Sequence, residues 1–572
     1  MKIKQVIHRI LQNHDLWPWL IFALISLFII GPLLSRGYIL TLDHTFTPTI
    51  HKSVGTVGSY LYIWHYFLWL LNHIIPSWLI EKIWLFLIFF LAGVGAYQLA
   101  PIKSILAKTF AGLLYIFNPF VYSRFLYGQW NLLTAYALFP FVAKIFLQFL
   151  EKPNWKDGLK AVLFLTIIAI VHLRTLTIFA VFGLVALIFH LYPLKKQYLT
   201  KLAVGIALML IGFVALNLYW ILPFFTAQSN QSLFSAGPEN LGLFSTVSDP
   251  QYSLLFNVGA MYGFWGDNEG RYLLIKNFIP FWPVLFLFLL CFVFLGLGGG
   301  LAQKESRRKT LMWFCVTILA IFLSAGPALP YLDTIYNWLY NHIFLFKSFR
   351  ETEKFSLLIV LGYCWLASFG LAMLLKIFAK KIILTTVIGV AALFLPIIYT
   401  PILPFAGWGQ LKAIQYPQSW YQINQITAQD KSQFKMLFLP WHRYLALNFA
   451  SGKIVENPAP GFFDKETIAG DNIEMGAVYT QSTSPVSKEI EENIVFSSDC
   501  NKFSQTLRDI DIKYVILAKE VDWQNYQYFS NCRLKNIFEA NELILYQNLD
   551  LEEPVASLQN LDFFEIREKV IE

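Results

Sequence analysis

Charged side chains are scarce in this sequence. Asp, Glu, Lys and Arg supply 14% of the 572 residues, whereas they supply about 25% of an ordinary soluble domain. Hydrophobic residues reach 56%, and the mean hydropathy is +0.53. These values exclude an ordinary soluble globular protein. The net charge of +8 does not indicate a nucleic-acid partner, because the Lys and Arg residues lie between hydrophobic runs, where cytoplasmic anchoring explains them.

The sequence also lacks the motifs of nucleotide and zinc chemistry. It contains no Walker motif, no dinucleotide fingerprint and no other glycine loop that would hold a phosphate. The glycine-rich stretch at 296–300 ends a hydrophobic run and predicts a helix end. Neither C-x-x-C nor H-E-x-x-H spacing occurs, which argues against a structural or protease zinc site. We therefore expect no nucleotide cofactor.

Cysteine is rare, with 5 residues in the chain. Cys291, Cys315 and Cys364 fall in hydrophobic runs, where a thiol behaves as a small apolar side chain. Cys500 and Cys532 fall in a polar region and could form a disulfide in an oxidising exterior.

Hydrophobic runs of about 20 residues, the length that crosses a bilayer, dominate the sequence up to residue 400. The first run, 16–34, follows Lys2, Lys4 and Arg9 and predicts an uncleaved helix with a cytoplasmic N-terminus. In all, the pattern predicts about eleven membrane-spanning helices. The others are expected at 78–100, 103–117, 132–150, 158–171, 175–191, 201–222, 272–297, 311–325, 355–377 and 382–399.

Basic residues gather in alternate connectors between these runs. Because Lys and Arg favour the cytoplasmic side, the pattern places the N-terminus inside and, with an odd number of helices, the C-terminus outside. The basic groups are Lys103/Lys108, Lys152/Lys156/Lys160, Lys195/Lys196/Lys201, Lys304/Arg307/Arg308/Lys309 and Lys376/Lys380/Lys381. We expect a multi-pass protein of a prokaryotic plasma membrane, with the lipid bilayer as its first partner.

A change in composition near residue 401 divides the chain into two predicted domains. Residues 1–400 form the transmembrane domain, and the polar residues 401–572 form an extracytoplasmic domain large enough for its own core. Strands are predicted at 435–439, 514–517, 534–538 and 543–546, and a helix at 420–426. The second domain is therefore predicted to be mixed α/β.

Asp43, in the loop after the first run, is the leading candidate for chemistry. Its carboxylate could act as a general base on a hydroxyl, or bind a divalent metal ion such as Mg²⁺ or Mn²⁺. Alternatively it caps a helix or a turn. His44 beside it could support Asp43 or lie on the surface.

Further candidate site residues lie in the other predicted external loops. His172 and Arg174 form a short tip, and Arg174 could bind a phosphate or extend toward lipid headgroups. The segment W-G-D-N-E-G contains Trp265, Asp267 and Glu269, which have the composition of a sugar-binding turn; the alternative is a disordered polar loop.

The segment R-E-T-E-K precedes a late hydrophobic run. Arg350, Glu351, Glu353 and Lys354 carry both signs of charge there. Such a cluster could bind a lipid-linked phosphate beside a working carboxylate. It could equally form a salt-bridged start to the following helix.

These features resemble the GT-C superfamily of membrane glycosyltransferases, which have an acid in the first external loop and many further helices. The segment Y-I-F-N-P-F-V-Y-S-R-F-L-Y-G-Q-W-N-L-L-T-A-Y-A-L-F-P (115–140) resembles AftD-type arabinofuranosyltransferases and YfhO-type membrane proteins. F-R-E-T-E-K-F (349–355) is similar to their F-R-x-x-x-K-F. The resemblance covers residues 1–400 in layout and only these patches in motif. The first loop departs from the family in having one acid rather than an acidic pair.

The resemblance implies a polytopic α-helical, GT-C-like protein that transfers a sugar from a polyprenyl-phosphate donor to an external glycan, lipid or protein. Asp43 would be the catalytic base or a metal ligand, and displacement would invert the anomeric carbon. The implied substrate-binding residues are His44, His172, Arg174, Trp265, Asp267, Glu269, Arg350, Glu351 and Lys354.

Two other functions are compatible with the sequence. A transporter or flippase of lipid-linked glycans would carry ionisable residues deep inside its spans. The predicted spans contain few, which favours an enzyme. A non-catalytic assembly factor would keep the layout without the chemistry, and the sequence does not separate it from an enzyme.

Overall fold

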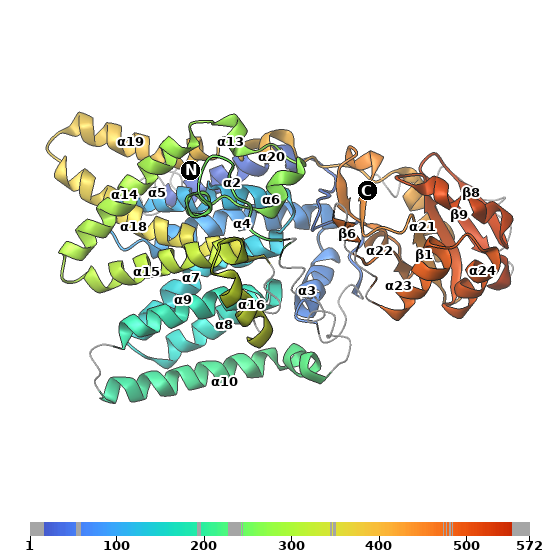
Figure 1. Ribbon diagram of the computed structural model, residues 1–572, viewed down its shortest axis with the longest axis horizontal. Helices are drawn as coiled ribbons and strands as arrows, with labels where there is room; N and C mark the ends of the chain where they lie inside the picture. The colour runs from blue at the N-terminus through green and yellow to red at the C-terminus, as the bar shows by residue number, and fades with distance from the viewer. Residues whose placement is uncertain are drawn as a thin grey trace, which may run out of the picture. The chain divides into compact units, whose positions relative to one another are not determined.

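The structure is a computed structural model. It describes residues 17–52, 59–191, 196–226, 242, 244–343, 346, 351–472, 474–475, 478–479, 482 and 484–551. The chain divides into two compact units, Met1–Ile414 and Gln415–Glu572. The first is helical and the second contains the main β-sheet (Figure 1).

Long apolar helices build the first unit. Among the described residues, 8 helices are long and apolar enough to cross a membrane, or 9 if one bent pair counts as a single span. The predicted total of about eleven is not confirmed by this length criterion. The described helices of this unit, long and short together, are α2 (Trp17–Ile30), α3 (Tyr62–Asn72), α4 (Ser77–Leu99), α5 (Ile105–Ile116), α6 (Pro119–Leu126), α7 (Trp130–Glu151), α8 (Trp155–Val171), α9 (Thr175–His190), α10 (Lys196–Thr226), α12 (Leu254–Gly259), α13 (Ile275–Phe278), α14 (Trp282–Ala302), α15 (Arg307–Ala325), α16 (Asp333–His342), α18 (Ser356–Ile377), α19 (Ile382–Tyr399) and α20 (Pro404–Gly409).

The bent pair is α5 and α6, and it shapes the site described below. Asn118 lies between the two helices and caps α6: its Oδ1 accepts from the Val121 N–H at 3.0 Å, and its Nδ2 donates to the Leu114 carbonyl of α5 at 3.0 Å. Pro119 follows at the first position of α6, where its fixed φ suits a helix start. The axis turns by 41° there. The hydrophobic run at 103–117 is therefore followed by a second helix, α6, whose axis is inclined to that of α5.

Two glycines let α14 and α18 cross closely. A Cβ at Gly296 would lie 1.8 Å from the Leu366 carbonyl oxygen, and one at Gly370 would lie 2.0 Å from that of Phe292. Small residues at such crossings allow helix backbones to touch inside a membrane. The glycine-rich stretch thus forms the last turns of α14, as predicted, and is also a packing surface.

The second unit contains a five-stranded sheet with the order β4-β1-β7-β9-β8. β4, β1 and β7 are parallel, whereas β9 runs antiparallel to both β7 and β8. The strand bounds are β1 (Lys435–Leu439), β4 (Thr467–Ile468), β7 (Ile512–Ala518), β8 (Leu534–Glu539) and β9 (Leu543–Asn548). All four predicted strands are present, and the helix predicted at 420–426 is α21 (Gln418–Gln429).

Helices and aliphatic strand residues form the core of this unit. Leu437, Val515 and Leu517 from the central strands pack with Phe503 of α24 (Cys500–Asp509). A disulfide joins Cys500 and Cys532. It links the start of α24 to the segment just before β8, and the sequence had left this pairing open.

Candidate functional site

An ion pair in α4 binds the backbone of the loop that follows α2. Glu81 accepts from the Ile39 N–H through both carboxylate oxygens, at 3.2 Å each, and Lys82 donates to the Gly37 carbonyl at 2.9 Å. The two side chains pair with each other at 2.7 Å, and both are buried. α4 thus carries one charged pair within a predicted span, and the pair satisfies loop backbone groups.

Asp43 lies at the tip of this loop in a fixed turn. The Thr41 N–H donates to the His44 carbonyl at 2.9 Å, and the Thr41 hydroxyl donates to the same oxygen at 2.7 Å. The Asp43 N–H donates to the Tyr127 carbonyl at 3.0 Å, which joins the loop to the end of α6. Gly128 has a φ of +82°, and a Cβ there would lie 1.8 Å from the Thr41 hydroxyl oxygen. Only glycine fits this contact without displacing the loop.

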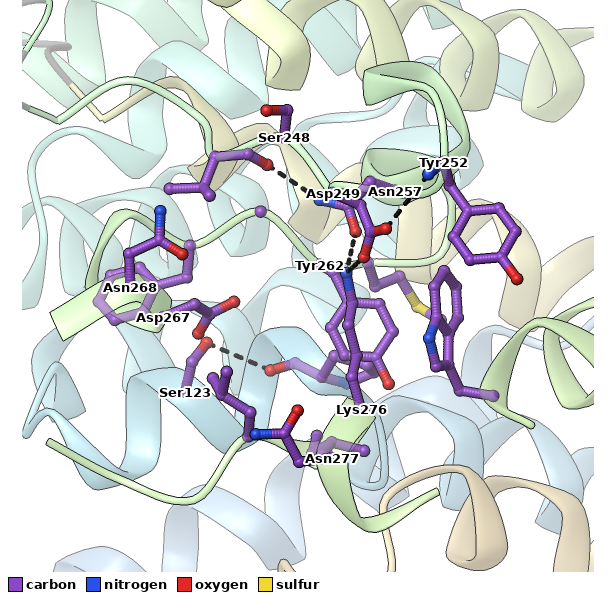
Figure 2. Close-up of a pocket in the computed structure, with 18 of the residues that line it drawn as sticks. Ser123, Ser248, Asp249, Tyr252, Asn257, Tyr262, Asp267, Asn268, Lys276 and Asn277 are labelled. Carbon is purple, nitrogen blue, oxygen red and sulfur yellow. Dashed lines mark hydrogen bonds and ion pairs between the residues drawn. The ribbon is translucent and has the colours of Figure 1, made fainter. Parts of the chain in front are cut away.

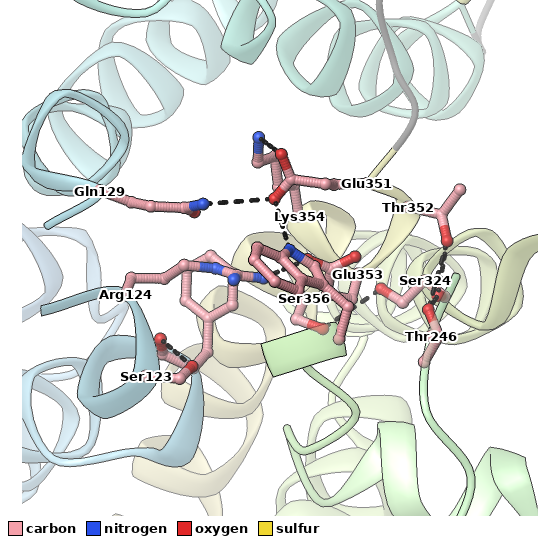
Figure 3. A network of polar contacts seen from close by, with 12 residues as sticks. Ser123, Arg124, Gln129, Thr246, Ser324, Glu351, Thr352, Glu353, Lys354 and Ser356 are labelled. Carbon is pink, nitrogen blue, oxygen red and sulfur yellow. Dashed lines mark hydrogen bonds and ion pairs between the residues drawn. The ribbon is translucent and has the colours of Figure 1, made fainter. Parts of the chain in front are cut away.

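One amide connects Asp43 to the segment before α18. Gln129 Nε2 donates to Asp43 Oδ2 at 2.9 Å. The same nitrogen donates to Glu351 Oε2 at 3.3 Å (Figure 3). The structure thus brings together two acids that the sequence placed in separate loops. Asp43 is exposed, whereas Glu351 is buried. Gln129 lies in the segment 115–140, but nothing in the local sequence indicates a role for it.

Glu351 has further partners that fix its position. Lys354 Nζ donates to Glu351 Oε1 at 2.9 Å, and the Trp265 indole N–H donates to Oε2 at 3.3 Å. Burial opposes ionisation of Glu351, but nearby positive charges, first Lys354 and then Arg124, lower its pKa below the ordinary value. Glu351 is therefore a carboxylate at neutral pH. Its pairing with Lys354 is also the salt-bridged helix start that the sequence offered as an alternative.

A second buried pair lies beside the first. Arg124 of α6 forms a salt bridge with Glu353, and the Arg124 side chain is completely buried (Figure 3). Its guanidinium also lies 3.9 Å from the centre of the Phe264 ring, within range of a cation–π interaction. Arg124 belongs to the segment 115–140, yet it was not among the predicted site residues.

His172 and Arg174 approach this cluster from the connector between α8 and α9. His172 Nδ1 hydrogen-bonds with the Thr175 hydroxyl at 2.8 Å. Burial first, and then the charges of Lys354 and Arg174, lower the pKa of His172 well below its ordinary value, so the ring is neutral. Arg174 is half-buried, and its side chain makes no hydrogen bond or ion pair with the residues that the structure describes. Its charge acts on Glu351.

The remaining predicted residues lie in different surroundings. The ring of His44 packs between Phe46, Trp84 and Trp130, at centroid distances of 5.0–5.2 Å, and burial lowers its pKa to about 3. His44 is therefore a packing residue rather than a surface histidine. Glu269 is exposed and pairs with Arg271. Arg350 lies outside the described residues.

The turn that contains Trp265 is ordered. It forms a 3-10 helix (Trp265–Glu269) and ends at Gly270 in the left-handed conformation, with φ +68°. Trp265 is buried against Glu351, whereas Asp267 lines a neighbouring cavity. Burial raises the pKa of Asp267 to about 6, although the charges of Arg124 and Lys276 oppose the shift. The expectation of a disordered loop is wrong for this turn.

The two acids of the site share one amide donor. No group of three or more His, Cys, Asp or Glu side chains gathers within the described parts of the chain. The carboxylates of Asp43 and Glu351 both accept from the Gln129 amide nitrogen, which is a donor. A cation between them would have to displace that amide.

The site and the basic connectors lie at opposite ends of the helices. Gln129 directly precedes α7, and at the far end of α7 Glu151 pairs with Lys309 of α15 at 2.5 Å. α15 then returns to the site, where the Ser324 carbonyl accepts from the Thr352 hydroxyl at 3.1 Å. The segments that the sequence assigned to one side of the membrane are thus gathered at one end.

Comparison with known proteins identifies the fold. No protein family model and no curated protein sequence matches the chain. The cryo-EM structure of arabinofuranosyltransferase AftD from Mycobacteria matches with a TM-score of 0.60 and 12% identity, over 93% of this chain and 40% of that one. A structure of a point mutant of that enzyme matches with a TM-score of 0.58, 12% identity and coverages of 92% and 41%. This chain is thus much shorter than the enzyme that it resembles. Its fold is a GT-C-like membrane fold.

Proposed function

We propose that this protein is a membrane glycosyltransferase that moves a sugar from a polyprenyl-phosphate donor to an extracytoplasmic glycan, lipid or protein. One observation carries the proposal: the Gln129 amide joins the exposed Asp43 to Glu351, and hence to Lys354 and Trp265. An exposed acid held rigidly beside buried charges suits a catalytic base better than it suits a turn residue. The fold shared with AftD agrees with this assignment.

The reaction follows from these positions. Asp43 takes the proton of an acceptor hydroxyl, and the hydroxyl oxygen attacks the anomeric carbon of the donor sugar. The bond between that carbon and the phosphate oxygen breaks, and the polyprenyl phosphate leaves with the electron pair. A single displacement inverts the anomeric configuration. The roles of the site residues are to align the acid and to stabilise the charge that develops on the leaving phosphate.

Arg174 is the cation best placed for that phosphate. Lys354 pairs with Glu351, and Arg124 pairs with Glu353, so both cations already have a carboxylate partner and maintain the shape of the site. Arg174 carries no such partner within the described residues and is half-buried, so its guanidinium is free to bind a phosphate with two parallel hydrogen bonds. A transporter is less well supported, because the buried Glu81 and Lys82 are engaged with loop backbone groups rather than lining a path.

The test is a transfer assay with the protein reconstituted in lipid and a panel of polyprenyl-phosphate sugars. We expect Asp43→Asn to lower kcat by about 100-fold or more, the usual contribution of a general base. Asp333→Asn is the matched control, because Asp333 is exposed and outside the network. Full activity in Asp43→Asn would refute the base. Wild-type protein that binds donors but never transfers would favour the assembly factor.

The same assay separates the two roles that the sequence left open for Asp43. A base keeps its activity in EDTA, whereas a metal ligand loses activity and regains it with Mg²⁺ or Mn²⁺. Because the Gln129 amide already lies between Asp43 and Glu351, we expect activity to survive the chelator.

A further inference from the structure

A cavity with a volume of about 390 Å³ lies beside the Glu351 network. It is bounded by α6, by the segment before α12 and by the segment from Met261 to α13. Figure 2 shows Asp267 and Asn268 on one side and Tyr252 on the other, with Lys276 between them. Its volume is at the small end of the range for ligand pockets, about 300–1,000 Å³. The transfer reaction proposed above assigns nothing to it.

The cavity and the Glu351 network share one wall. Trp265 donates to Glu351, and Asp267, two residues later in the same 3-10 helix, lines the cavity. Phe264 also lines the cavity and stacks on Arg124, the partner of Glu353. A ligand in the cavity would therefore lie next to the segment that positions the buried carboxylates.

The charges of the cavity do not suit a phosphate. The described lining contains one ammonium group, that of Lys276. This group already donates to Asp249 and to Asn257, both at 2.5 Å. It also lies 4.6 Å and 4.8 Å from the ring centres of Tyr262 and Trp282. Asp249 offsets the positive charge of Lys276. The carboxylate of Asp267 then gives the lining a net negative charge. A phosphate would be repelled, so the donor headgroup does not belong here.

The side chains that stay available suit a neutral sugar. Asp267 makes no side-chain hydrogen bond with the described residues, so its oxygens can accept from hydroxyl groups. Asn268 and Asn277 are exposed amides on the lining that both donate and accept. Tyr252 is 36% exposed and presents an aromatic ring to the apolar face of a sugar.

We infer that this cavity binds a neutral carbohydrate and is the acceptor-side subsite of the transferase. The assignment to an acceptor rests on the proposed function, whereas the choice of a neutral sugar rests on the lining alone. The position fits this role, because the wall shared with Trp265 places the cavity next to the site of Asp43 and Glu351.

The first test measures binding to the purified protein in lipid nanodiscs. The probes are methyl glycosides of pentoses and hexoses and their disaccharides, followed by saturation-transfer NMR, with inorganic phosphate as competitor. We expect at least one glycoside to bind without competition from phosphate. Tyr252→Ala should weaken that binding by about tenfold, since an aromatic contact contributes up to about 1.5 kcal/mol and 1.4 kcal/mol is tenfold. Tyr331→Ala, at a residue that is 91% exposed and outside the cavity, is the control.

Several outcomes would overturn the inference. Competition by phosphate would identify an anion site, and equal binding by wild type and Tyr252→Ala would place the sugar elsewhere. The absence of binding by any glycoside would also refute it.

A second test uses transfer kinetics. Tyr252→Ala and Asp267→Asn should raise KM for the acceptor and leave KM for the donor unchanged. Transfer that is indifferent to both changes would overturn the subsite alone. Tyr252-dependent binding in a protein that transfers no sugar would overturn the proposed function alone.

Discussion

Gln129 is the residue on which the geometry of the site depends. Its single amide nitrogen contacts two carboxylates that are 86 and 222 residues away in the sequence. Each contact is a hydrogen bond to a charged group, the stronger class of such bonds. Gly128 allows this arrangement, because its missing side chain lets Thr41 and the loop of Asp43 approach the start of α7.

We predict that Gln129→Ala lowers kcat for sugar transfer by about 10- to 100-fold, because a hydrogen bond to a charged group contributes about 1.5–3 kcal/mol. KM for the donor should change little, since Gln129 positions Asp43 rather than the lipid phosphate. The measurement is steady-state transfer kinetics on reconstituted protein. Gln148→Ala is the matched control, because Gln148 is an exposed residue near the other end of α7. Equal kcat values in the two variants would contradict the positioning role.

The sequence revealed part of this site and missed the rest for a physical reason. Asp43, Glu351 and Lys354 stood out because charges next to hydrophobic runs are unusual and have few structural explanations. Gln129 did not stand out, because a neutral amide at a helix start has no local feature that shows its distant partners. The same limit applied to Arg124, whose partner Glu353 is 229 residues away.

At the scale of elements, hydrophobic length identified the helices but not their shapes. Runs of about 20 apolar residues predict spans reliably because backbone groups in a bilayer must be satisfied within the helix. The pattern did not show that α5 bends into α6 at Asn118, since one amide cap and one proline decide that. Nor did it establish the number of spans, because α8 and α9, with 17 and 16 residues, fall just below the 18 residues required of a span.

The ion pair in α4 gives a prediction at this scale. Lys82→Met leaves Glu81 buried without its cationic partner, and breaking a buried pair costs about 3–5 kcal/mol. We expect a large fall in the thermal unfolding midpoint, measured in detergent or nanodiscs. The double variant Glu81→Gln/Lys82→Met removes both charges and should recover part of the loss. If Lys82→Met matched wild type, the pair would not be holding the loop of Asp43.

At the scale of the whole molecule, the two ends of the helical unit have different chemistry. Polar and charged residues of the site gather at one end, while Glu151 and Lys309 join two basic connectors at the other. The excess of Lys and Arg predicts that the second end faces the cytoplasm. The proposed donor is an external lipid-linked sugar, so this orientation is a condition of the proposed function.

Cysteine labelling tests the orientation directly. Glu305→Cys places a thiol in the exposed basic connector between α14 and α15, and Thr334→Cys places one in exposed helix α16 near the other end. In intact cells, a membrane-impermeant maleimide should label Thr334→Cys and not Glu305→Cys, whereas after lysis it should label both. Cys291, Cys315 and Cys364 make the parent protein the necessary control. Labelling of Glu305→Cys alone in intact cells would place Asp43 in the cytoplasm. That result would refute transfer from an external donor, because base and substrate would lie on opposite sides of the membrane.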